Sequence, residues 1–112
     1  MIRITFKDAS VKANKIRPEI FSAIATAADV WENYGADELV VTSLNDGSHR
    51  QGSYHYTGDA VDIRSKNLPS SAAKRNARDL LAARLGKDFD VILEDLGGPN
   101  EHVHIEHDEN KP

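Results

Sequence analysis

The chain has 112 residues, no cysteine and a formal net charge of −4 at pH 7. The absence of cysteine excludes disulfides, thiolate nucleophiles and sulfur-ligated metals. Acidic and basic residues are mixed without a basic run, which argues against a nucleic-acid partner. A chain of this length buries enough surface for one core, so we expect a single domain over residues 1–112. We also expect the protein to be a monomer.

The first half of the chain shows two strand patterns and one helix pattern. Residues 2–6 alternate apolar and polar side chains, which predicts a short strand. Residues 18–34 predict a helix that begins with Pro18 and ends before Gly35. Its apolar face consists of Ile20, Ile24, Ala27 and Trp31. The β-branched run at 38–43 predicts a buried strand, and the turn-forming residues after it predict a loop.

The second half adds three strand patterns and a second helix. Residues 60–64 and 102–106 alternate with period two, and residues 89–94 form a further strand candidate. Between them, a helix is predicted from about Ser70 to Leu85. Because there is no regular βαβ rhythm, we expect an α+β fold with both helices on one face of a mainly antiparallel sheet. The polar tail at 108–112 is expected to fray.

No segment has the pattern of a secretory leader or a membrane span. The first fifteen residues lack an apolar core of signal-peptide length, and no apolar run is long enough to cross a bilayer. We therefore expect cytoplasmic synthesis, with action in the periplasm or cell wall if the protein is exported or released by a phage.

The five histidines lie in two short clusters, and the alternation of the last strand groups some of them. His102, His104 and Glu106 share the face opposite Val103 and Ile105. Asp62 likewise lies opposite Val61 and Ile63. If the two strands belong to one sheet, imidazoles and carboxylates converge on one polar face, and His55 could complete the group. His49 and His107 are the other two histidines.

These side chains leave two interpretations open. Imidazole nitrogen and carboxylate oxygen are good ligands for Zn²⁺, and three protein ligands with one open position are typical of a catalytic zinc site. Alternatively, Asp62 pairs with Arg64 and the histidines are ordinary surface residues of a metal-free domain.

The stretch SYHYTGDAVDI at 53–63 resembles the zinc motif of the superfamily that joins D-Ala-D-Ala carboxypeptidases, phage L-alanyl-D-glutamate endopeptidases and the hedgehog signalling domain. The pattern S-x-H-x-x-G-x-A-x-D is met at each specified position, and EHVHIE at 101–106 is similar to its second half. The order of elements matches from about residue 16 to 107. The local pattern is most similar to hedgehog and its bacterial look-alikes.

The resemblance implies His55, Asp62 and His104 as zinc ligands. The peptidases' general base, three residues before the last ligand, would be Glu101, which we prefer. The hedgehog pattern instead implies Glu94, at the end of the preceding strand. Further candidates for the catalytic site, which would stabilise an oxyanion, are His49, Arg50 and His102.

The implied function is a zinc metallopeptidase that acts on a peptidoglycan stem peptide of D-Ala-D-Ala or L-Ala-D-Glu type. The alternative is a hedgehog-like zinc-binding interaction module with little or no hydrolysis. Hedgehog also binds calcium through acidic residues, but the loop SLNDGSH offers only Asp46, so we do not expect a calcium site. Glu106 and His107 are expected to be ordinary strand-end residues.

Overall fold

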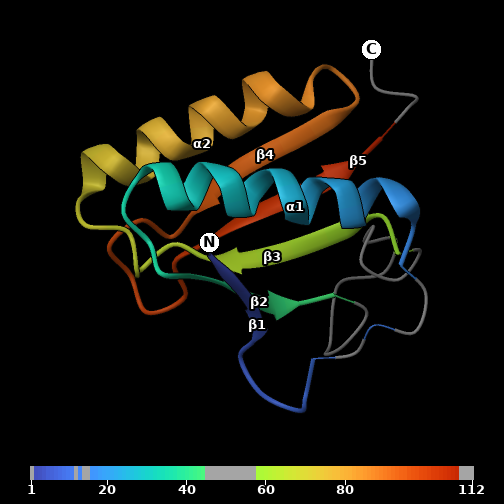
Figure 1. Ribbon diagram of the computed structural model, residues 1–112, viewed down its shortest axis with the longest axis horizontal. Helices are drawn as coiled ribbons and strands as arrows, with labels where there is room; N and C mark the ends of the chain where they lie inside the picture. The colour runs from blue at the N-terminus through green and yellow to red at the C-terminus, as the bar shows by residue number, and fades with distance from the viewer. Residues whose placement is uncertain (1, 12, 14–15, 45–57, 109–112) are drawn as a thin grey trace.

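The computed structural model describes residues 2–11, 13, 16–44 and 58–108 (Figure 1). Within these ranges the chain forms five strands and two helices. In chain order they are β1 (Arg3–Phe6), α1 (Pro18–Asn33), β2 (Glu38–Ser43), β3 (Ala60–Arg64), α2 (Ser71–Leu85), β4 (Phe89–Glu94) and β5 (His102–His107). All seven correspond to predicted elements, and the ends differ by one residue at most.

The five strands form one mixed sheet in the order β1-β2-β3-β5-β4. The pairs β2–β3, β3–β5 and β4–β5 are antiparallel, whereas β1 and β2 are parallel. The sheet is therefore mainly antiparallel, as expected, but it is not purely antiparallel. Helix α1 connects the two strands, and a helical crossover returns the chain in its original direction. The α+β class is confirmed.

Both helices lie on the same face of the sheet, as Figure 1 shows. The predicted apolar face of α1 is buried in full, and Trp31 has no exposed surface. The indole Nε1 of Trp31 also donates to the backbone oxygen of Arg64 at 3.0 Å, which fixes α1 over the end of β3. The sheet contributes Leu39, Val41, Val61, Ile63, Val103 and Ile105 to this core, each fully buried.

The start of α2 is fixed by a side-chain cap. Ser70 is extended, and its side-chain oxygen accepts from the backbone N–H of Ala73 at 3.0 Å. Such a cap satisfies one of the free N–H groups at a helix start and typically contributes about 1 kcal/mol. The cap positions Lys74 one turn into the helix, where it contacts the β4–β5 connection.

Neither helix in the described part of the chain is both long and apolar enough to cross a membrane.

Candidate metal centre

The pairing of β3 with β5 brings the predicted polar residues together. Asp62 lies directly opposite His104, with Arg64 opposite His102 and Ala60 opposite Glu106. The intervening residues Val61, Ile63, Val103 and Ile105 are fully buried under the helices. Alternation therefore turns Asp62 and His104 to the other face of the sheet, as predicted.

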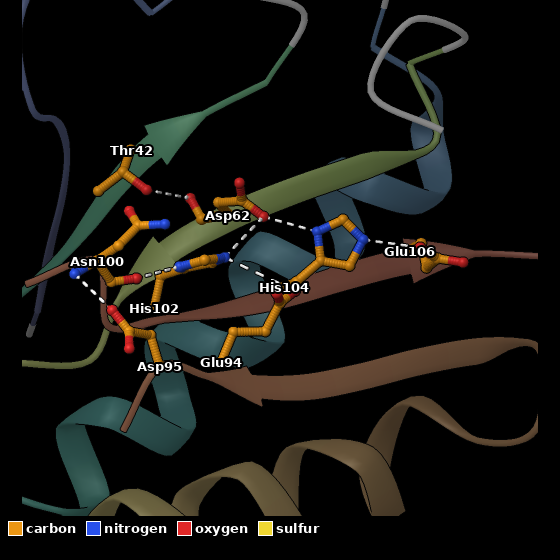
Figure 2. A network of polar contacts seen from close by, with 8 residues as sticks. All are labelled: Thr42, Asp62, Glu94, Asp95, Asn100, His102, His104 and Glu106. Atoms are coloured by element: carbon orange, nitrogen blue, oxygen red, sulfur yellow. Dashed lines mark hydrogen bonds and ion pairs between the residues drawn. The ribbon is translucent and has the colours of Figure 1, made fainter. Parts of the chain in front are cut away.

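His104 is held between two carboxylates, as Figure 2 shows. Its Nδ1 lies 2.7 Å from Oδ1 of Asp62, and its Nε2 lies 2.7 Å from Oε1 of Glu106. An ionised carboxylate only accepts hydrogen bonds, so a ring that satisfies both carries two protons. Burial alone would lower the pKa of His104, but the hydrogen bonds to Asp62 and Glu106 outweigh it and raise this pKa to about 9.

The donor types of the Asp62–His104 pair are compatible with zinc. Two ligand atoms bound to one tetrahedral zinc ion at 2.0–2.1 Å lie about 3.3 Å apart. The Nδ1–Oδ1 separation of 2.7 Å is shorter, so the ion would replace the Nδ1 proton while the two side chains move apart by about half an ångström.

A complete centre needs a further ligand. In the part of the chain that the structure describes, no group of three or more His, Asp or Glu side chains is arranged to hold a metal ion. The predicted first ligand, His55, lies at 45–57, outside the described residues, as do His49 and Arg50.

His102 lies beside this pair, with its ring orientation fixed by the backbone. Its Nδ1 is 2.6 Å from the carbonyl oxygen of Asn100, which can only accept, so Nδ1 is the donor. The other ring nitrogen, Nε2, lies 3.9 Å from Oδ1 of Asp62 and 3.8 Å from Oε1 of Glu94. His102 therefore directs Nε2 toward the space between these two carboxylates (Figure 2).

The turn between β4 and β5 sets the position of Asn100. Asp95 has a φ of 52°, a left-handed conformation that Asp tolerates better than most residues. Its carboxylate accepts from the backbone N–H of Asn100 at 2.9 Å, and its carbonyl accepts from that of Gly98 at 2.8 Å. A Cβ at Gly98 would overlap the Asp95 carboxylate, so any other residue would have to displace this carboxylate.

Glu94 shares the face of His102. It pairs with His102 in the β4–β5 register, and 47% of its side chain is exposed. A general base must come within hydrogen-bond reach of the proton that it abstracts, here a proton of the attacking water. The half-exposed Glu94 carboxylate is open to water, and His102 lies between it and the Asp62 carboxylate.

Glu101 is directed to the opposite side, where 1% of its side chain is exposed. Ser65 donates to it at 2.5 Å, Lys74 at 2.9 Å, and the backbone N–H of Gly97 at 3.0 Å. Burial would raise the pKa of Glu101, but these three donors together hold it below the usual value. The buried and hydrogen-bonded surroundings of Glu101 therefore do not support the preference for this residue as the base. The exposure of Glu94 and its position beside His102 favour Glu94 instead.

Sequence reasoning missed two features of this site. Glu106 was expected to be an ordinary strand-end residue, although its position two residues after His104 placed it on the same face. The burial of Glu101 could also have been predicted from the same alternation. Positions 101, 103 and 105 fall on the same face, and Val103 and Ile105 are core residues. The partners of Glu101, which are Ser65 and Lys74, come from distant segments and leave no local signal.

Comparison with known proteins finds no matching family model, no matching curated protein and no matching solved structure.

Proposed function

We propose that the protein is a zinc-dependent peptidase that hydrolyses cell-wall-type peptides of the D-Ala-D-Ala or L-Ala-D-Glu class. The observation that carries the proposal is the 2.7 Å contact between Asp62 and His104. Two separate motifs name these residues as ligands of one ion, and their contact is independent of the motif resemblance. The resemblance of 53–63 and 101–106 to the carboxypeptidase, endopeptidase and hedgehog superfamily supplies the reaction class.

In this proposal His55, Asp62 and His104 hold the zinc ion. When bound, zinc supplies a Lewis acid that acidifies a water molecule and polarises a peptide carbonyl. The protein's own residues do the remaining work. Asp62 and His104 hold fixed positions because both lie on paired, central strands, and a site on such strands holds its geometry better than one on loops.

Glu94 is the proposed general base. Its half-exposed carboxylate accepts a proton from the attacking water and passes it to the leaving amine. His102 lies between Glu94 and Asp62. When protonated, its Nε2 donates to the negative charge that develops on the carbonyl oxygen.

The test is digestion of purified muropeptides, followed by mass spectrometry. We expect a loss of one D-alanine, or a cut between L-alanine and D-glutamate, and at least a hundredfold loss of rate in Glu94→Gln. The matched variant Glu101→Gln should retain turnover if it folds. Turnover that is unchanged in Glu94→Gln would remove Glu94 as the base.

A second candidate function is a hedgehog-like zinc module that binds a partner without hydrolysis. The observation that favours it is the burial of Glu101, whose carboxylate accepts hydrogen bonds from Ser65, Lys74 and Gly97, because this position matches the base of the peptidases. Zinc-loaded protein that leaves every muropeptide intact would favour this candidate.

A further inference from the structure

The carboxylate of Glu106 contacts His104 on the side away from Asp62. Its Oε1 lies 2.7 Å from Nε2, the same separation that joins Nδ1 to Asp62. Glu106 follows His104 by two residues on β5, so the pleat of the strand places both side chains on one face. Its side chain is 26% exposed, and that of His104 is 13% exposed, so the contact is partly shielded from water.

We propose that Glu106 is a positioning residue that fixes the ring of His104 so that Nδ1 faces the metal position. This inference rests on the proposed zinc function. A metal-ligating histidine commonly donates its second ring N–H to a carboxylate, which fixes the ring's orientation and increases the basicity of the ligating nitrogen. Glu106 occupies that place for Nε2, and it leaves Nδ1 as the nitrogen directed at Asp62 and the ion.

A purely structural role for the same contact predicts different behaviour. A partly exposed ion pair that only stabilises the fold contributes up to about 1 kcal/mol and leaves zinc affinity unchanged once the protein is folded. A positioning role instead changes the affinity for zinc in folded protein. It also predicts a graded response, because glutamine keeps an oxygen acceptor for Nε2–H whereas alanine keeps none.

The experiment measures zinc affinity by competition with a chromogenic chelator in the full-length protein. We expect the Kd to increase about tenfold in Glu106→Gln and up to about a hundredfold in Glu106→Ala. The control is Asp29→Asn, which removes one negative charge from an exposed position on α1, across the sheet; its Kd should match wild type. Urea unfolding of each variant without metal shows whether it is folded under the conditions of the zinc titration, so that Kd values are compared only between folded proteins.

A second readout is the ¹⁵N spectrum of the His104 ring. In zinc-loaded wild type we expect a metal-bound Nδ1 and a protonated Nε2 whose proton exchanges slowly, and in Glu106→Ala a rapidly exchanging Nε2 proton. Equal Kd values for wild type and folded Glu106→Ala would overturn the positioning role and leave the zinc function intact. A wild-type protein that binds no zinc would overturn the proposed function itself and the inference that rests on it.

Discussion

Asp62 and His104 lie 2.7 Å apart although 42 positions separate them in the sequence. Direct pairing of β3 with β5 produces this contact, because the two residues face each other in the antiparallel register. A shift of the register by one residue would turn one of them into the core. The buried residues that alternate with them therefore also define the candidate site.

The pH dependence of stability in the metal-free protein tests the state of His104. Its folded pKa is raised from 6.5 to about 9, so its contribution is fully present below pH 6.5 and is lost as the pH rises through 9. With solvent screening, we expect this part of the unfolding free energy to be about 1–2 kcal/mol.

Urea unfolding at pH 6 and pH 9.5 in the presence of a chelator measures this loss. The variant His104→Gln cannot titrate at this position and corrects for all other groups. If the unfolding free energy of wild type and of His104→Gln decreases equally between the two pH values, then His104 is not the titrating group.

The network around Glu101 should be structural. In Glu101→Gln the charge that compensates Lys74 is lost, and the Lys74 side chain is only 15% exposed. We expect a decrease of about 2–3 kcal/mol in the unfolding free energy, because an unpaired buried charge is costly. The matched variant Glu94→Gln, on the exposed side, should change stability by less than about 0.5 kcal/mol. Equal urea midpoints for the two variants would contradict this account.

The close approach at Gly98 can be tested by a double-mutant cycle. In Gly98→Ala the new Cβ displaces the Asp95 carboxylate from the N–H of Asn100. We expect a loss of about 1 kcal/mol, the value of a typical hydrogen bond. In an Asp95→Ala background, Gly98→Ala should cost much less, since the overlapping carboxylate is gone. Strictly additive costs in thermal or urea unfolding would mean that the two residues do not interact.

Most of the secondary structure could be predicted because the local patterns are strong. The ranges of β2, β3 and β4 agree with the predicted strands to the residue, and each is a run of β-branched or alternating residues. Pro18 and Ser70 mark the helix starts for local reasons, through a fixed φ and a side-chain cap. The shared face of Asp62 and His104 followed from the same period-two rule.

The features that could not be predicted depend on contacts between distant segments. The parallel pairing of β1 with β2 is a property of the whole topology, and both directions fit the pattern of residues 2–6. Likewise, the choice between Glu94 and Glu101 depends on Lys74 and Ser65, which contact Glu101 from α2 and from the residue after β3.

The central claim is that Asp62 and His104 bind one zinc ion together. Its most direct test is the zinc content and zinc affinity of the full chain. The protein is refolded without metal, a defined amount of zinc is added, and binding is measured by elemental analysis and calorimetry. We predict one zinc ion per chain in wild type and in Asp29→Asn, and loss of this binding in Asp62→Ala and His104→Ala, with wild type and all three variants folded by circular dichroism. Folded wild type that binds no zinc, or that binds it equally well without Asp62 and His104, would contradict the claim.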